Sequence, residues 1–573
     1  MKFNSVEHHS NEADGTGRIH GFAPLSRRGF LGGVAGVGVL SLLGGCSNGA
    51  GGTGSTGAAS DESSGSILAY YISNPTAIDP YNCQETMGSQ VVSQLFDGLM
   101  IYDFQNDELV CTACESYEMN DDATVFTFHL REGMTFHNGD TVDAQSFKRA
   151  FERIVDPSTN DSPSAISYHL EPVQGYDELL SGDADELSGV TCPDELTLVI
   201  SLKYSYADFP YVLTHPALVP VPQAALDDPA SYLLAPIGNG PFQMEGQWED
   251  GQMISVRKFD DYYGTPSSID GVDFSIRRDV GSAYMEFQAG TLDFCQVPNA
   301  QYEDATQQYG ISNDGYTATP GNQVLNGSEL STYYLIINNT QPPFDDVNLR
   351  RAVSLAINRE AICETVFNGN RTPADGFVAP MVDGYQEGSW EYCKYDPDQA
   401  REILDQYYPA DADGNRGITL QLSYDLNGDH ADIMDVVMSS LNEVGIQVTA
   451  DTGEWANIVA RVHDLDYQFC RMGWSADYPT LDNFLYPLFC SSSPDDASGY
   501  KNDEVDAAIA EARATVDHDE RIAKFQAVDK MIGEDCPVVP LFYYQHNYVV
   551  AERVDELYLS PGIIPSLDAV KMG

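Results

Sequence analysis

The sequence predicts an α/β fold, and three observations support this prediction. Strand-like and helix-like segments alternate from Ile67 onward, no internal repeat is visible, and no long linker interrupts the chain after Gly65. Such alternation is typical of layered α/β domains, whereas solenoids and propellers repeat with a period of about 20–50 residues. Because no linker separates them, the domains are expected to be interleaved, with the chain crossing between them more than once.

The first elements are a strand, a helix and a second strand. Residues 125–130 (VFTFHL) alternate as a half-buried strand does. Residues 143–155 carry apolar side chains at helical spacing, with Asp143 placed to cap the start and Pro157 to end the helix. Residues 194–202 (DELTLVISL) are again predicted as a strand.

The second half of the chain continues the alternation. Residues 349–367 have the pattern of one long amphipathic helix. Asp396 and Pro397 match the cap and the first position of a further helix. The remaining predicted elements are a strand at 418–424, a helix at 433–445 closed by Gly445, and a strand at 446–451.

The composition is that of a folded, strongly acidic protein. Hydrophobic residues make up 42% and aromatic residues 11% of 573 residues, enough for several cores. The formal net charge is −58, which argues against nucleic acids and anionic lipid surfaces as partners, because their phosphates would be repelled. The excess of acid forms a solubilising surface and mildly favours cationic solutes.

The N-terminus has the features of an export signal. Residues 26–33 (SRRGFLGG) contain twin arginines, an apolar run too short to cross a bilayer follows, and LLGGC ends at Cys46. The order predicts a twin-arginine lipoprotein signal peptide at residues 1–45 and lipidation of Cys46, as in a bacterial or archaeal lipobox. Residues 46–65 are rich in Gly, Ser and Thr and are predicted to be a flexible tether with a reach of roughly 25 Å.

No motif in the sequence predicts catalysis, a metal or a cofactor. The chain lacks G-x-S-x-G, H-E-x-x-H and the P-loop pattern, so it is not expected to be an enzyme. DADGNRG (411–417) lacks the glycine and the last glutamate of a calcium loop and is interpreted as a hairpin or a helix–strand loop. Cys111 and Cys114 form a CxxC pair without a zinc partner pair. Disulfides suit an exported protein, but the pairing of the ten cysteines other than Cys46 stays open.

Five segments, in order, resemble the extracytoplasmic solute-binding proteins of peptide-importing ABC transporters, the oligopeptide-binding family known as family 5. They are residues 126–157, 236–244 (PIGNGPFQM), 333–360, 473–479 (GWSADYP) and 536–544 (CPVVPLFYY). The similarity runs from about residue 66 to nearly the C-terminus. It implies a two-lobed, periplasmic-binding-protein-like clamp with interleaved lobes and an extra third domain. The implied boundaries are lobe I at 66–104, 207–281 and 541–573, the extra domain at 105–206, and lobe II at 282–540.

The resemblance also implies a function and its partners. A protein of this family captures oligopeptides between its lobes and delivers them to the transmembrane subunits of an ABC permease. This chain would then be a monomer, lipid-anchored on the outside face of the cytoplasmic membrane, without a cofactor or a metal. Such a protein holds the peptide backbone, which all peptides share, by pairing it with strand edges.

The site residues come from the match to the family. The aspartate of RMGWSADYP, Asp477, matches the carboxylate that meets the peptide amino terminus, since a buried charge needs a partner. Arg471, His430 and, by a weaker alignment, Arg461 match groups that meet the peptide carboxylate, for which a guanidinium fork is suited. The side-chain pockets and backbone contacts are expected from Trp455, Trp474, Tyr478, Tyr544, Glu85, Gly473 and Ser475.

Other interpretations stay open for each of these residues. Asp477 would equally suit a turn cap before Pro479, Arg471 a salt bridge to one of the many acids, and His430 a solvated loop. The aromatic residues would equally suit a packed core. The same fold also serves non-peptide solutes, namely nickel complexes, haem or oligosaccharides, and fold alone does not decide the ligand.

Overall fold

The computed structural model describes residues 66–83, 85–159, 164, 166–412, 414–493 and 496–573. The predicted signal peptide, the tether and Cys46 lie outside these residues. Within the described part, no helix is long and apolar enough to cross a membrane. The ten cysteines in this part are all free thiols, so none of the disulfides that would suit an exported protein is formed among them.

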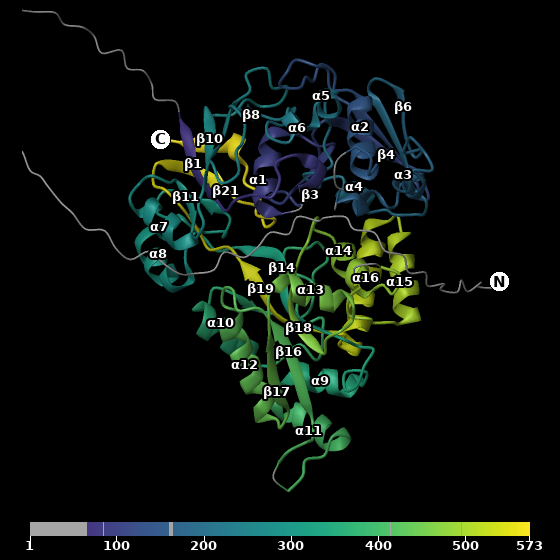
Figure 1. Cartoon of the computed structure of the whole chain (residues 1–573), viewed down its shortest axis with the longest axis vertical. Helices are drawn as coiled ribbons and strands as arrows, with labels where there is room; N and C mark the ends of the chain where they lie inside the picture. Colours follow the sequence, from purple (N-terminus) through teal and green to yellow (C-terminus); the bar gives the residue numbers. More distant parts are fainter. Residues whose placement is uncertain (1–65, 84, 160–163, 165, 413, 494–495) are drawn as a thin grey trace, which may run out of the picture. The chain divides into compact units, whose positions relative to one another are not determined.

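A seven-stranded mixed sheet contains the first strand of the described chain. β1 lies at its centre, parallel to β10 and β11, and the outer pairs are antiparallel. Three helices contact strands of this sheet, namely α1 (Thr86–Leu95), α7 (Val280–Gln288) and α8 (Tyr302–Tyr309) (Figure 1). In sheet order the strands are β13 (Val324–Leu325), β20 (Tyr548–Val550), β11 (Phe294–Gln296), β1 (Ile67–Ile72), β10 (Gly271–Ile276), β9 (Ile254–Lys258) and β8 (Phe242–Met244).

A four-stranded antiparallel sheet packs against the predicted helix that Asp143 caps. The strands, in sheet order, are β4 (Cys114–Met119), β5 (Val125–Leu130), β7 (Thr197–Ser201) and β6 (Val190–Asp194). Asp143 and Ser146 form a capping box at the start of α2 (Ala144–Val155), which contacts β6 and β7. The apolar core is continuous from this sheet to the seven-stranded sheet.

A six-stranded sheet is built mainly from the second half of the chain. Its strands, in sheet order, are β15 (Thr372–Pro373), β19 (Val538–Gln545), β14 (Ser328–Ile337), β18 (Phe469–Ser475), β16 (Thr419–Tyr424) and β17 (Gln447–Thr452) (Figure 1). The central strand β14 is buried on both faces: Tyr334 and Ile336 enter one core, while Tyr333 and Leu335 enter the other. A strand segment covered on both sides is nearly all apolar, as β14 is from Tyr333 to Ile337.

Two small sheets and the remaining helices complete the fold. The small sheets are β2 (Met100–Asp103) with β3 (Glu108–Cys111), and β12 (Thr317–Ala318), β21 (Val554–Tyr558) and β22 (Lys571–Met572). The other helices are α1 (Thr86–Leu95), α3 (Tyr176–Ser181), α4 (Phe209–Val212), α5 (Ala224–Asp227), α6 (Pro229–Tyr232), α7 (Val280–Gln288), α8 (Tyr302–Tyr309), α9 (Val347–Ala356), α10 (Arg359–Phe367), α11 (Pro397–Tyr407), α12 (His430–Glu443), α13 (Trp455–His463), α14 (Leu481–Phe489), α15 (Asp503–Arg513) and α16 (His518–Asp535).

Most predicted elements are confirmed, but the single long helix at 349–367 is wrong. The chain forms α9 and α10, because Ile357 is extended and Asn358 caps α10 by accepting a hydrogen bond from the backbone N–H of Ala361 at 2.9 Å. A side chain that caps a new helix competes with continuation of the old one. Residues 411–417 connect α11 to β16, as the interpretation as a helix–strand loop predicted.

The crossings between the two large sheets differ from the expected boundaries. β11 and β13 lie within residues 282–540, the range expected in lobe II, yet they pair in the sheet of β1. The chain enters the six-stranded sheet at β14 and returns after β19 to β20. Strand periodicity reports which residues are buried but not which strand is the neighbour, so the sequence pattern could not locate these crossings.

Candidate ligand-binding site

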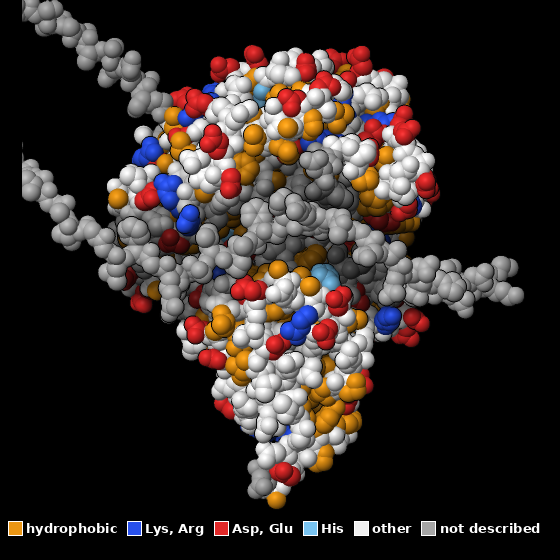
Figure 2. Space-filling model, in the orientation of Figure 1, with side chains coloured by type: hydrophobic (Ala, Val, Ile, Leu, Met, Phe, Trp, Pro, Cys, Tyr) orange, Lys and Arg blue, Asp and Glu red, His pale blue; other side chains and the backbone are white. Residues whose placement is uncertain are grey.

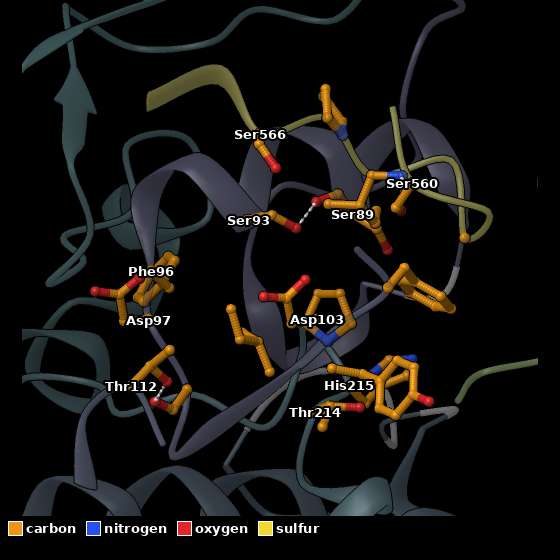
Figure 3. A pocket seen from close by; sticks show the side chains of 18 of the residues that line it. Ser89, Ser93, Phe96, Asp97, Asp103, Thr112, Thr214, His215, Ser560 and Ser566 are labelled. Atoms are coloured by element: carbon orange, nitrogen blue, oxygen red, sulfur yellow. Dashed lines mark hydrogen bonds between the residues drawn. The ribbon is translucent and has the colours of Figure 1, made fainter. Parts of the chain in front are cut away.

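A cavity of about 590 Å³ is bordered by segments from widely separated parts of the chain. Its walls include α1 and β2, the loop after α4, the C-terminal residues 558–568, and the turn at 477–479 that follows β18. Figure 3 shows Ser89, Ser93 and Ser566 on one side of the cavity and Thr214 and His215 on the opposite side. Its size lies in the usual range of small-ligand sites.

The charged groups on the cavity wall are carboxylates. Its lining, as far as the structure describes it, contains no Lys and no Arg, and its acids are Glu85, Asp97, Asp103, Asp477 and Asp568. Burial raises the pKa of Asp97 to about 6, against the hydrogen bonds that Tyr262 and Tyr263 donate to it at 2.7 Å. Acidic side chains are also widespread on the face in Figure 2. The cavity therefore favours a cationic group.

Asp477 lies on this wall, in the turn between β18 and α14. Its backbone N–H donates to Oδ1 of Asn483 at 3.0 Å, which anchors the turn. Among the described residues, its carboxylate accepts two long hydrogen bonds, from the Tyr168 hydroxyl at 3.3 Å and from Nδ2 of Asn483 at 3.4 Å. Burial raises the pKa of Asp477, and nearby His215 opposes this shift. None of the described Lys or Arg side chains forms a salt bridge with Asp477 within 4.0 Å.

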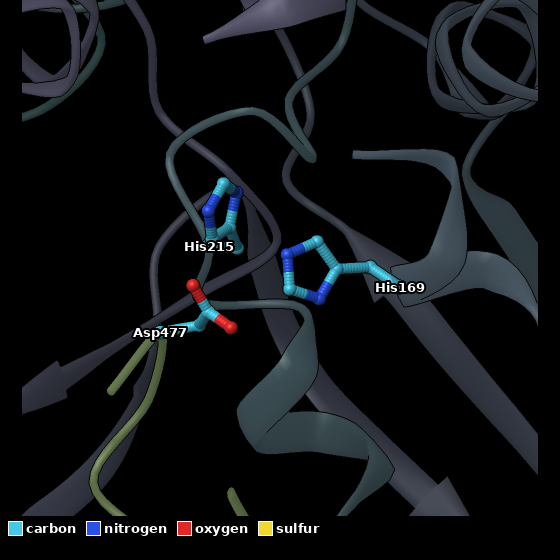
Figure 4. Close-up of side chains that lie close together, drawn as sticks. All are labelled: His169, His215 and Asp477. Carbon is cyan, nitrogen blue, oxygen red and sulfur yellow. The ribbon is translucent and has the colours of Figure 1, made fainter. Parts of the chain in front are cut away.

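Two histidines stand beside this carboxylate. His169 belongs to the 3₁₀ turn Ser167–Leu170, and His215 follows α4. Figure 4 shows the carboxylate of Asp477 turned toward both imidazole rings. One nitrogen of each ring and one oxygen of Asp477 all lie within 4.8 Å of one another. Burial lowers the pKa of each histidine to about 3, so both rings are neutral near pH 7.

Arg471 lies outside the cavity lining and is paired with a buried acid. Its Nε donates to Oδ1 of Asp425 at 2.9 Å, and its NH2 group donates to the same oxygen. The indole of Trp455 stacks on the guanidinium, with 3.4 Å between Cζ and the ring centroid. Burial would raise the pKa of Asp425, but the hydrogen bonds and the charge of Arg471 outweigh it, so the net pKa is lowered. The alternative interpretation of Arg471, a salt bridge, describes this contact.

His430 and Arg461, like Arg471, have partners within the protein. Nδ1 of His430 is 3.0 Å from the Tyr333 hydroxyl, and its Nε2 is 3.9 Å from Oδ1 of Asp425. Burial lowers the pKa of His430, and the charge of Arg471 adds to this effect. Arg461 donates from its NH2 group to Asp451 at 2.7 Å. The carboxylate-binding role of these residues stays a prediction.

The remaining predicted residues divide between the cavity and other surroundings. Glu85 lines the cavity but caps α1, accepting from the backbone N–H groups of Met87 at 2.7 Å and Gly88 at 2.8 Å. Tyr478 also lines it, with its hydroxyl 3.2 Å from that of Tyr206. The other four are not among the cavity lining: Gly473, Trp474 and Ser475 on β18, and Tyr544 on β19.

Sequence reasoning missed four residues that surround the predicted ones. Asp425 lies five residues before His430, and nothing in the local sequence distinguishes it from the other acidic residues, of which the chain has 87 in all. Tyr168, His169 and His215 carry no local motif, because only folding brings the 3₁₀ turn and the loop after α4 to the end of β18. No signal in the sequence pointed to them.

Comparison with known proteins agrees with this fold. The family model described as bacterial extracellular solute-binding proteins, family 5, matches residues 108–496, more than half of the chain. The chain is 30% identical over 484 residues to the glutathione-binding protein GsiB of Escherichia coli K12, covering 82% of this chain and 87% of that protein. It is 27% identical over 488 residues to the periplasmic oligopeptide-binding protein OppA of the same strain, covering 83% and 86%.

Solved structures show the same fold. OppA of Haemophilus influenzae, in complex with RPPGFSPFR, superposes with a TM-score of 0.69 at 24% identity, covering 88% of this chain and 99% of that chain. OppA of Burkholderia pseudomallei has a TM-score of 0.71 at 23% identity, covering 89% and 99%. The α/β fold and the family match together define the class as an extracytoplasmic solute-binding protein of an ABC transporter. The chain belongs to family 5 of the bacterial extracellular solute-binding proteins.

Proposed function

We propose that this protein captures oligopeptides outside the cell and delivers them to an ABC-type import permease. The observation that carries this proposal is the state of Asp477: a partly buried carboxylate on a cavity wall, with a raised pKa and two long hydrogen bonds from the part of the chain that the structure describes. A partly desolvated anion without a cationic partner is poised to receive one. The free ammonium of a peptide amino terminus provides the matching charge and three N–H donors.

The rest of the cavity supports the same ligand class. Four further carboxylates and no described Lys or Arg line it, so a ligand with a positive end, or with basic side chains, gains from the field of the wall. Hydroxyls of Ser89, Ser93 and Ser566 on the wall offer hydrogen bonds that do not depend on a particular side chain. The carboxylate end would lie toward Arg471 and His430, which requires Arg471 to share or release Asp425.

The proposal includes the attachment of the protein to the membrane. The twin arginines and the small residues before Cys46 support export and lipidation, so that residues 46–65 would tether a monomeric binding protein to the outer face of the cytoplasmic membrane. Closure of the clamp around its ligand would present the surface that the permease subunits recognise, since ligand binding favours the state with which it makes more contacts. No bond is made or broken by this chain.

Asp477→Asn tests the proposal at the amino terminus of the peptide. The variant should lose about 2–5 kcal/mol of affinity for a tripeptide, the scale for truncating one side of a buried charge pair, as measured by calorimetry. Asp464→Asn, at an exposed acid outside the cavity lining, is the matched control and should bind normally. An N-acetylated tripeptide should bind wild type as weakly as the free tripeptide binds Asp477→Asn.

Two results would reject the peptide assignment. One is equal affinity of wild type and Asp477→Asn for the free tripeptide, and the other is equal binding of free and acetylated peptides. Mass spectrometry of material that co-purifies with the protein identifies the ligand directly. A bound nickel complex, haem or oligosaccharide would replace oligopeptides as the substrate class.

A further inference from the structure

We propose that His169, His215 and Asp477 form a site for one divalent late transition-metal ion on the wall of the cavity. This site goes beyond the capture of peptides, although it uses the same carboxylate. The three side chains come from three separate segments, and Figure 4 shows them facing a common point. Among the described residues, no other group of three or more His, Cys, Asp or Glu side chains has its potential ligand atoms this close together.

The separations allow a metal to draw the three groups together. The potential ligand atoms lie within 4.8 Å of one another, while ligands about 2.0–2.2 Å from a tetrahedral ion are roughly 3.3 Å apart. Binding would therefore have to shorten the longest of these separations by at most about 1.5 Å, and rotation of the Asp477 side chain would bring its carboxylate closer to the two rings. Asp477 can rotate because its two hydrogen bonds, from Tyr168 at 3.3 Å and Asn483 at 3.4 Å, are long.

His169 supplies the strongest independent indication of a ligand. The residue is only 4% exposed, and its buried Nε2 has no hydrogen-bond partner among the described residues. A buried polar nitrogen is almost always paired, and leaving it unpaired costs free energy. The neutral ring carries one unprotonated nitrogen, and coordination to a metal would satisfy a buried nitrogen that the fold leaves unsatisfied.

His215 is the ligand that must change its contacts. Its Nδ1 accepts a hydrogen bond from the backbone N–H of Ala217 at 3.2 Å, so the proton of the neutral ring is on Nε2. Coordination at Nδ1 displaces this bond, and coordination at Nε2 moves the proton to Nδ1 and also breaks it. In both cases a single long hydrogen bond is exchanged for a metal bond, and the ring stays neutral.

The ligand set indicates the class of ion. Two imidazoles and one carboxylate suit Zn²⁺, Co²⁺, Ni²⁺ or Cu²⁺, whereas Mg²⁺ and Ca²⁺ prefer sites made of oxygen atoms. Both His215 and Asp477 border the cavity, so a fourth position would face it and accept water or a donor atom of a bound solute. Because a metal and a peptide ammonium would use the same carboxylate, the two should compete.

Metal titration of the full-length protein tests this site. After treatment with EDTA, the protein should bind one Zn²⁺ at this site in calorimetry, and Co²⁺ should give visible absorption bands of a four- or five-coordinate site. His169→Gln, His215→Gln and Asp477→Asn should each weaken Zn²⁺ binding by at least about 10–100-fold, a scale already reached when groups that only support the ligands are changed. His463→Asn, at an exposed histidine, is the control and should leave binding unchanged.

The adjacent histidines His8 and His9 are a separate source of metal affinity, and His8→Ala/His9→Ala removes it. The proposal is overturned if this variant binds no Zn²⁺ or Co²⁺ at micromolar concentrations, a result that does not depend on how the buried variants fold. It is also overturned if His169→Gln binds Zn²⁺ as tightly as wild type.

The two proposals fail in different ways. If tripeptides bind and metals do not, the metal site is wrong and peptide capture stands. If Zn²⁺ binds and the free and acetylated tripeptides are not distinguished, peptide capture is wrong and the metal site stands. If both bind, Zn²⁺ should lower the apparent affinity for the free tripeptide, and unchanged affinity would overturn the shared use of Asp477.

Discussion

Replacing Asp425 with asparagine should destabilise the protein, because it leaves the charge of Arg471 without its counter-charge. The Asp425 side chain is 3% exposed and that of Arg471 is 13% exposed. Removing one partner of a buried ion pair costs about 3–5 kcal/mol. Asparagine keeps one acceptor for the guanidinium, and the ring of Trp455, 3.4 Å away, stabilises the cation by about 1 kcal/mol. The expected loss is therefore about 2 kcal/mol, below the full range.

Urea unfolding followed by tryptophan fluorescence measures this loss as a lower midpoint. Arg471→Met/Asp425→Asn is the control, since removing both charges leaves neither uncompensated, and it should recover most of the stability lost in Asp425→Asn. An unchanged midpoint in Asp425→Asn would refute the reasoning, because it would mean that Arg471 is solvated well enough to need no anion.

The same variant tests the predicted role of Arg471 in ligand binding. Release from Asp425 leaves the guanidinium free for another carboxylate. If Arg471 receives the end of the peptide, Asp425→Asn should prefer a free tripeptide over its C-terminal amide more strongly than wild type does. Equal preference in the two proteins would assign Arg471 to the internal pair alone.

Two further predictions concern stability. Asp79→Ala should lower the free energy of unfolding in urea by about 3–5 kcal/mol. Asp79 and Arg153 both have 1% exposed side chains and share hydrogen bonds of 2.6 and 2.7 Å. The control Asp79→Ala/Arg153→Met should recover much of this loss, and an Asp79→Ala variant as stable as wild type would contradict a stabilising role of this ion pair. His169 has a folded-state pKa of about 3, below its ordinary value, so the unfolded chain takes up a proton that the folded chain does not as pH falls below about 6.5. Wild type should therefore lose about 2–3 kcal/mol more than His169→Gln between roughly pH 7 and pH 4.5, and parallel stability curves would show that His169 is not held neutral.

The sequence by itself determined the elements whose signals are local. The alternation in VFTFHL, the cap at Asp143 and the Asp396–Pro397 start are interactions between near neighbours, and β5, α2 and α11 form where they predict. The ordered family segments likewise led to the family, because each is a continuous stretch of chain. The one helical error, at Asn358, arose where a side-chain cap overrode an apolar period that continues through it.

Tertiary structure alone decided which side chains meet. The sequence pointed to Asp477 and Arg471 as two ends of one site, but packing places a buried acid, Asp425, against the guanidinium, and turns two histidines toward Asp477. It also decided that β11 and β13 join the sheet of β1. The physical reason is that burial depends on contacts between residues that are distant in the chain, which no local pattern encodes. Burial in turn sets the pKa of each ionisable group and the energy of its interactions with other charges.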